Sequence, residues 1–206
     1  MTALTHAQTV TEATGENSDA APRLSTRQLI RGDFQTWAKI WCGPADHAHV
    51  RPRQAAKLLW NQCGLRATLL LRLSHALWRA HVPALPGMVA RLNLTLHGLD
   101  VPPSVEIGPG LYVPHPVGTV VMARRIGARV SLVSAITIGM RHTPIFPILE
   151  DDVFVGAGAR ILGDVTVGTG ASIGANAVVV KDVPPGATAV GVPARILAAK
   201  DSGTDL

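Results

Sequence analysis

Residues 155–186 read VGAGARILGDVTVGTGASIGANAVVVKDVPPG, and an aliphatic residue returns at every sixth position of this stretch. The period extends back along the chain, with one extra residue between Val113 and Ile126 and five between Ile138 and Leu149. An amphipathic helix needs apolar residues at a spacing of about 3.6, and the many glycines would weaken it. The pattern therefore predicts a repeat of short strands. Its aliphatic members are Ile107, Val113, Val120, Ile126, Leu132, Ile138, Leu149, Val155, Ile161, Val167, Ile173 and Val179.

Each six-residue unit is long enough for one short strand and one corner. Glycine often follows the aliphatic residue, where a tight corner favours a residue without a Cβ atom. Three units close a triangular coil, so every third aliphatic residue stacks above the last at the strand spacing of about 4.8 Å. Single repeats cannot bury their apolar face alone, so the aliphatic side chains should fill the interior of a mainly β, parallel β-helix.

The rest of the chain differs from the repeat. The first residues are polar and lack apolar periodicity, while the stretch before the Pro102-Pro103 pair has helical patterns. We therefore expect four segments: a flexible leader (1–22), a small α-helical N-terminal region (23–99), the β-helix (100–198) and a tail (199–206).

The helical region should contain an amphipathic helix followed by a second one. Leucines recur every four residues, and arginines occupy the other faces, where we expect them to be solvated. Pro83 and Pro86 should close this helix, and the second is expected over residues 87–96. The leucines are Leu65, Leu69, Leu73 and Leu77, and the arginines are Arg66, Arg72 and Arg79.

The net charge of +5 is unevenly distributed, because residues 23–99 contain eleven Lys or Arg against two Asp. Such a region can bind anions, but no nucleic-acid-binding motif accompanies it, so we expect no nucleic acid partner. The N-terminus lacks the basic and apolar pattern of a signal or transit peptide, which predicts a cytoplasmic protein. Arginines interrupt the most apolar stretch, so no spanning helix is expected. Cys42 and Cys63 lack metal or redox spacing and should be reduced and packed.

Three motifs resemble a known family: IGPGLYVPHPVG at 107–118, the block at 155–186, and AVGVPARIL at 189–197. They are similar to the hexapeptide-repeat acyltransferases and, within these, to the serine acetyltransferase-like group, over about residues 65–198. The resemblance implies a left-handed β-helix that assembles as a homotrimer or a dimer of trimers. It also implies an O-acetyltransferase whose co-substrate acetyl-CoA lies along the coil at sites between neighbouring subunits.

The same resemblance implies the site residues. His115 matches the family's catalytic histidine, and Asp100 matches the aspartate fifteen positions earlier. An imidazole can remove the proton of an attacking hydroxyl, and a carboxylate can fix its tautomer. Backbone groups of Gly139, Ala157 and Ala175 would contact CoA. Each residue also has a purely structural alternative. His115 could be hydrogen-bonded to a backbone carbonyl group, Asp100 could be a turn residue, and Ala157 and Ala175 could be small residues that fit the corners.

Two positions depart from the family pattern. Serine acetyltransferases place an acidic residue before the catalytic histidine, and here Pro114 stands there. Their Arg-His-Pro loop sequence matches Arg141-His142, which then bind the acceptor or face solvent, or else its His-Pro matches Phe146-Pro147. An unpaired buried charge is costly, so losing the acidic residue weakens the case for L-serine as the acceptor and leaves a saccharide open. Docking of the basic helix over 65–80 on an anionic membrane is a further possibility, although packing in the trimer is the preferred use of its leucines.

Two other functions share this architecture. A γ-type carbonic anhydrase needs three histidine ligands for zinc, but the repeat holds only His115 and His142, so no metal is expected. A scaffold protein would keep the β-helix without the chemistry, and would not bind acetyl-CoA.

Overall fold

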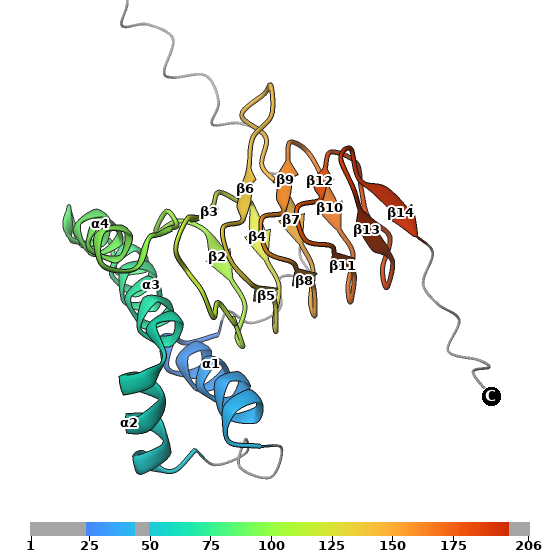
Figure 1. The fold of residues 1–206 in the computed structure, drawn as a ribbon. Helices are drawn as coiled ribbons and strands as arrows, with labels where there is room; N and C mark the ends of the chain where they lie inside the picture. Colours follow the sequence, from blue (N-terminus) through green and yellow to red (C-terminus); the bar gives the residue numbers. More distant parts are fainter. Residues whose placement is uncertain (1–23, 44–49, 198–206) are drawn as a thin grey trace, which may run out of the picture.

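The computed structural model describes residues 24–43 and 50–197, which form a helical region followed by a β-solenoid (Figure 1). The predicted leader (1–22) and the predicted tail (199–206) lie outside the described residues. Within the described ranges, no helix has both the length and the hydropathy that a membrane crossing requires.

Four helices precede the solenoid in the described chain: α1 (Thr26–Trp41), α2 (Pro52–Asn61), α3 (Cys63–Arg79) and α4 (Leu85–His97). The first helix begins with a capping box, in which the Ser25 side chain accepts the Gln28 N–H and the Gln28 side chain accepts the Ser25 N–H. The last helix ends at Gly98, whose left-handed conformation favours glycine. The chain enters the first strand at the next residue.

Helix α3 ends at Arg79, just before the region of Pro83 and Pro86, as expected. Pro86 itself lies in the first turn of α4, where its missing N–H costs nothing. One expectation about the helices is wrong: Arg72 is not solvated, since it is 1% exposed, whereas Leu73 in the leucine series is 47% exposed. Of the leucine series only Leu65 is buried, and the buried residues of α3 are Gly64, Leu65, Ala67, Thr68, Leu71, Arg72, Ser74 and His75.

The solenoid consists of three sheets, one on each side of a triangular coil. Sheet A contains β1 (Leu99–Asp100), β3 (Thr119–Val121), β6 (Thr137–Gly139), β9 (Arg160–Leu162) and β12 (Val178–Val179). Sheet B contains β2 (Glu106–Ile107), β4 (Arg125–Ile126), β7 (Ile148–Leu149) and β10 (Thr166–Val167). Sheet C contains β5 (Ser131–Leu132), β8 (Phe154–Val155), β11 (Ser172–Ile173), β13 (Thr188–Val190) and β14 (Arg195–Leu197). All pairings are parallel except that of β13 with β14, which closes the end of the solenoid.

The predicted aliphatic column fills the core, which confirms the parallel β-helix. Eleven of the twelve predicted members are buried, with exposures between 0% and 6%. The exception is Val120, because Val121 occupies the core position and pairs with Ile138. Val113 and Val121 are eight residues apart instead of six, so the corner that contains His115 is widened.

A second column of buried residues supports the first and was not predicted. It lies two positions before the large aliphatic residues, and its members are mostly Val or Ala. Small side chains suit this position because the triangular cross-section narrows toward each corner. Members in the central coils are Val153, Ala159, Val165, Ala171 and Ala177.

The five inserted residues leave the solenoid as a loop between β6 and β7, as predicted for an insertion into a repeat (Figure 1). Arg124 holds the base of this loop. Its backbone N–H donates to the Pro147 carbonyl at 2.9 Å, and its Nε donates to the Phe146 carbonyl at 3.0 Å. The guanidinium also pairs with Asp164 at 2.8 Å.

Candidate active site

His115 lies on one edge of the triangular coil, at the corner that leads from sheet C to sheet A. It forms a parallel bridge with Ser134 in the next coil, and its N–H donates to the Val133 carbonyl at 3.2 Å. The Ser134 carbonyl in turn accepts the Gly158 N–H at 2.9 Å. This column of corners, which we call the open edge, contains His115, Ser134, Ala157 and Ala175. The fold thus aligns three of the predicted site residues on one edge.

The open edge carries backbone N–H groups without partners. Those of Ala157 and Ala175 donate no hydrogen bond within the described residues, although their neighbours Gly158 and Asn176 do. Ala157 is half-buried and Ala175 is exposed, so both amides are accessible to a ligand. Free amides in adjacent coils suit the carbonyl groups of an extended ligand along the solenoid.

The edge between sheets B and C uses the same corner geometry, but carboxylates bind the amides of two of its corners, while the Asp151 N–H has no partner within the described residues. The Ala128 N–H donates to the Asp151 carboxylate at 2.9 Å, and the Thr169 N–H donates to Glu150 at 2.8 Å. The Thr169 hydroxyl and N–H bind the Glu150 carboxylate and hold its pKa below the ordinary value. We call this column the capped edge.

In the first coil, the capped edge is closed by a buried ion pair from the helices. Asp33 of α1 accepts the N–H groups of Gly110 and Leu111, each at 2.9 Å. Arg72 of α3 pairs with both Asp33 oxygens at 2.8 and 3.0 Å, and donates to the carbonyls of Ile107 and Gly108 at 2.6 Å. Burial raises the pKa of Asp33 while Arg72 and the two amides oppose the shift, so the carboxylate depends on these partners.

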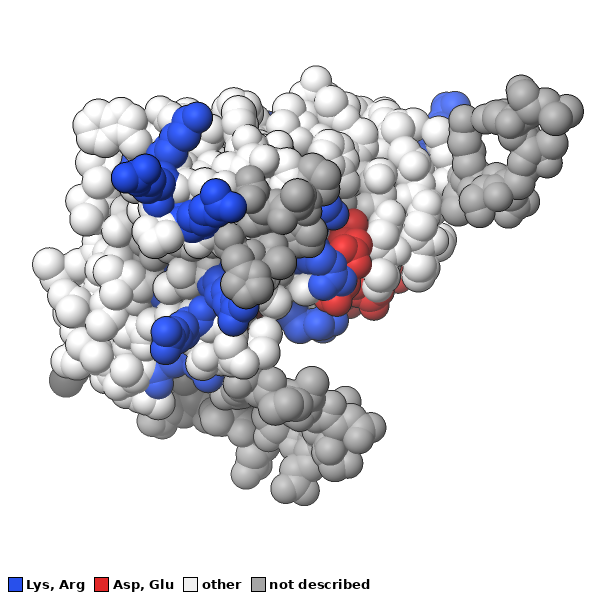
Figure 2. All heavy atoms as spheres, turned by 90° about the horizontal axis from the view of Figure 1, so that it is seen from below, with Lys and Arg blue, Asp and Glu red and all other residues white. Residues whose placement is uncertain are grey.

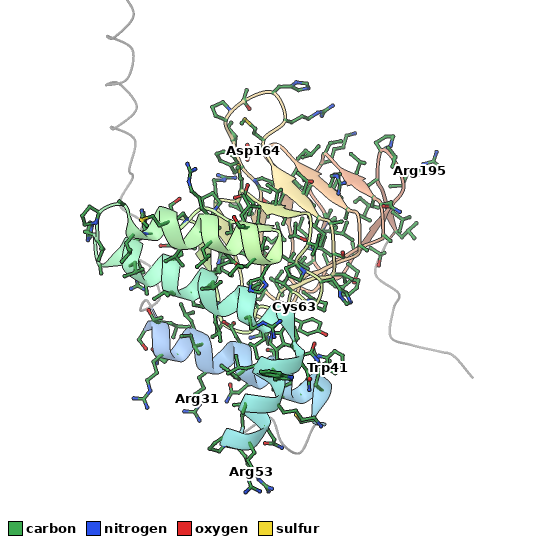
Figure 3. The ribbon with its side chains drawn as sticks, turned by 60° about the vertical axis from the view of Figure 1, so that its left-hand side comes forward. Arg31, Trp41, Arg53, Cys63, Asp164 and Arg195 are labelled. Carbon is green, nitrogen blue, oxygen red and sulfur yellow. The ribbon has the colours of Figure 1, made fainter. Side chains whose placement is uncertain are left out.

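The start of α3 supports the chain just before His115. Gly64 lies directly against the Val113 carbonyl, where any Cβ atom would clash. The Cys63 thiol lies 4.0 Å from the Pro114 carbonyl. Cys63 is exposed, so the expectation that it is packed is wrong, whereas Cys42 is half-buried; neither forms a disulfide (Figure 3 labels Cys63). Together with the Asp33–Arg72 pair, these contacts position the segment that ends in His115.

Asp100 lies on sheet A, beside the widened corner. It pairs in register with Val120, and the Gly118 N–H donates to the Gly98 carbonyl at 3.0 Å. In the part of the single chain that the structure describes, no hydrogen bond joins the Asp100 carboxylate to the imidazole of His115. His115 is exposed, and no carbonyl group of the described residues binds its ring. The pairing with Asp100 therefore stays a prediction.

The other predicted residues lie across sheet A from the open edge. Gly139 ends β6, and its carbonyl accepts the Gly163 N–H at 2.9 Å. Arg141 and His142 are exposed on the inserted loop. The two groups of predicted residues thus flank opposite sides of sheet A within one chain. Strand β7 pairs with β4 so that Leu149 lies opposite Ile126. Phe146-Pro147 therefore lies at the base of the inserted loop, and Arg141-His142 lies farther out along it.

Sequence reasoning missed Arg160, which lies on sheet A next to the open edge. Its Nη1 donates to the carbonyls of Ala135, Gly158 and Ala159 at 2.6, 2.9 and 3.2 Å. The side chain is half-buried and places a positive charge beside the free amides of this edge. Its outward strand position in the VGAGARILG sequence was the available signal.

The described residues contain no group of three or more His, Cys, Asp or Glu side chains that could hold a metal ion. The open edge offers an exposed imidazole at His115 and backbone donors at Ala157 and Ala175 in later coils. This combination suits general-base catalysis on a ligand held along the edge.

Comparisons with known proteins identify the family of the chain. A bacterial transferase hexapeptide model matches residues 146–181. A serine acetyltransferase of Haemophilus influenzae is 34% identical over 190 residues, which cover 85% of this chain and 70% of that protein. The chain belongs to the serine acetyltransferase family.

Another member, from Synechocystis, is 38% identical over 153 residues, covering 70% of this chain. Among solved structures, soybean serine acetyltransferase in complex with serine matches with a TM-score of 0.72 and 32% identity, over 84% of this chain and 70% of that one. This family member spans only 61% and 60% of the Synechococcus elongatus and Synechocystis relatives. The family and fold that the motifs predict are thereby confirmed.

Proposed function

We propose that the protein is an acetyl-CoA-dependent O-acetyltransferase that transfers an acetyl group directly to a hydroxyl of a small polar acceptor. One observation carries the proposal: an exposed histidine and two unpaired backbone amides occupy the same edge of the solenoid. In this proposal, the amides of Ala157 and Ala175 bind carbonyl groups along the CoA arm, which brings the thioester toward His115.

The reaction would proceed in a ternary complex. His115 accepts the hydroxyl proton as the acceptor oxygen attacks the thioester carbon. The bond to sulfur then breaks, and the imidazolium returns the proton to the departing CoA thiolate. Asp100 would stabilise the imidazolium and fix the ring tautomer. Neither cysteine lies in the solenoid, which supports direct transfer over a thiol acyl-enzyme.

A homotrimer completes the proposed site. His115 and the free amides lie on one side of sheet A, while Arg141 and His142 extend from the other. A neighbouring subunit could bring its inserted loop to the open edge, so that Arg141 and His142 contact the acceptor there. A cytoplasmic location remains part of the proposal.

L-Serine is the first acceptor to consider, since the relatives are serine acetyltransferases and the soybean enzyme was solved with serine. A saccharide is the second candidate, and Pro114 favours it. The residue before His115 offers no carboxylate for an ammonium group, and the base of the inserted loop is formed by Phe146-Pro147. A neutral acceptor needs no such charges.

Release of CoA thiol tests the proposal. The protein is mixed with acetyl-CoA and either L-serine or a panel of saccharides, and the thiol is measured by a colorimetric reagent. Release that depends on a hydroxyl acceptor supports the proposal, and its acceptor dependence separates serine from saccharides. If calorimetry detects no acetyl-CoA binding, the chain is a scaffold and the proposal fails.

A further inference from the structure

The helical region carries a strongly basic surface. In residues 24–43 and 50–99 the single acidic residue is Asp33, which is buried against Arg72. Lys and Arg side chains gather over the helical end of the molecule, while the acidic side chains in the same view lie toward the solenoid (Figure 2). We define the basic face as Arg27, Arg31 and Lys39 of α1 with Arg51, Arg53 and Lys57 at α2, all of them exposed.

None of these six side chains forms a salt bridge with another described residue. Arg31 and Arg53 both extend away from the solenoid (Figure 3). Their charges therefore add to one another at the surface and attract an anionic partner.

Exposed aromatic and aliphatic residues lie among these charges. Trp60 is 86% exposed, Trp41 is 53% exposed and Ile40 is 50% exposed. Arg53, Lys57 and Trp60 are spaced four and three residues apart, which places them on one face of α2. A hollow of about 360 Å³ between α1 and α2 is lined by both Trp41 and Lys57. The basic face thus combines cations with large apolar side chains in one area.

We propose that the basic face docks on an anionic phospholipid bilayer. Lys and Arg are attracted to anionic headgroups, and tryptophan favours the boundary between headgroups and acyl chains. A nucleic acid duplex would use the charges but would leave the exposed Ile40 and Trp60 without a role. Pairing of two basic faces from two copies would bring like charges together, and is disfavoured for that reason. This inference does not depend on the proposed acetyl transfer.

Vesicle sedimentation of the full chain tests the proposal. Phosphatidylcholine vesicles are compared with vesicles that also contain phosphatidylglycerol. Binding to the anionic vesicles should be at least about tenfold stronger, and should weaken as salt screens the charges. No binding, or equal binding to both kinds of vesicle, overturns the proposal.

Two sets of variants test the location. Reversing three charges with Arg31→Glu, Arg53→Glu and Lys57→Glu should abolish binding to anionic vesicles. The matched control is Arg91→Glu, Lys181→Glu and Arg195→Glu, which changes the net charge equally at exposed positions elsewhere. The control should retain most of the binding. An equal loss of vesicle binding in both sets would mean that only the net charge matters. That result would overturn the proposal that the basic face is the docking surface.

The apolar part is tested by Trp60→Ser, with Trp78→Ser on α3 as the matched control, since Trp78 is 45% exposed. Only Trp60→Ser should weaken vesicle binding, by several-fold. Circular dichroism checks that the variants fold. If the chain binds a DNA duplex but not vesicles, or if Trp60→Ser changes only the oligomeric mass, another partner occupies this face and the proposal is wrong.

Discussion

The open edge and the capped edge of the solenoid have the same corner geometry and opposite chemistry. At the capped edge, Asp33, Asp151 and Glu150 accept backbone N–H groups from the corners that contain Gly110, Ala128 and Thr169. At the open edge, the amides of Ala157 and Ala175 have no partner in the described chain, and His115 is exposed on the same edge, two coils before Ala157. The repeat alone therefore does not create a site. The site arises where the chain omits the side chains that would otherwise satisfy its corners.

The largest effect should come from breaking the ion pair that closes the capped edge. Arg72→Met would leave the Asp33 carboxylate buried without its cation, and should lower the free energy of unfolding by about 3–5 kcal/mol. Urea denaturation at equal protein concentration measures this loss. Arg79→Met is the control, because Arg79 is exposed and should matter little. Equal stability of the two variants would show that Arg72 does not support the first coil.

The next effect tests the chemistry of the open edge. His115→Ala should lower kcat at least about a hundredfold, since it removes the proposed base, while acetyl-CoA affinity measured by calorimetry stays nearly unchanged. The exposed His81 provides a control substitution outside the solenoid. An active His115→Ala enzyme would remove this residue from the mechanism.

Removing single amides compares the two edges directly. Pro109 and Pro185 occupy the positions of the capped edge that correspond to Ala157 and Ala175 on the open edge. This corner geometry therefore accepts proline. Ala157→Pro or Ala175→Pro should each raise the KM for acetyl-CoA about tenfold, because each deletes one hydrogen-bond donor. The serine variants at these two positions retain the N–H and should bind normally.

Thr169→Pro is the matching substitution on the capped edge, where Glu150, and not a ligand, accepts the Thr169 N–H. Its effect should appear in stability and leave the KM for acetyl-CoA unchanged. A rise in KM here, or none at Ala157 and Ala175, would contradict the assignment of the two edges.

The smallest effect concerns Glu150. Its pKa is lowered in the folded chain, so its contribution is complete above the ordinary value of 4.5 and is lost as the pH falls through the lower folded value. Glu150→Gln should cost less than about 1 kcal/mol, because the pair is exposed. The difference between wild type and variant, followed by urea denaturation, should shrink on acidification. A constant difference between neutral and strongly acidic pH would exclude this role.

The sequence predicted the solenoid far better than the helices. A six-residue period fixes which side chains point inward, because a one-position error exposes the whole column. The one misplaced member, Val120, lies after the widened corner, where the period no longer determines the register. In α3, by contrast, the leucine series indicated the wrong face. Which face of this helix is buried depends on the side chains of α1 and of the first coil that pack against it. A helix surface can pack through several faces, and tertiary contacts choose among them.

The candidate site, too, could be predicted from the sequence only in part. The motif around His115 and the corner positions of Ala157 and Ala175 could be read from the residues and the family resemblance. Their alignment on one edge, and the absence of partners for their amides, could not, because hydrogen-bond partners come from other coils. Asp33 and Arg72 are 39 residues apart, and Arg160 reaches carbonyls of two coils, so neither arrangement leaves a local pattern.

By itself, the sequence determined the repeat, the aliphatic core and the family, because each depends on residue spacing along the chain. The tertiary structure decided which corners are capped and which are open, which arginine is buried, and where the basic face lies. Those properties depend on contacts between distant segments, and the energy of each contact is set only when both partners are in place.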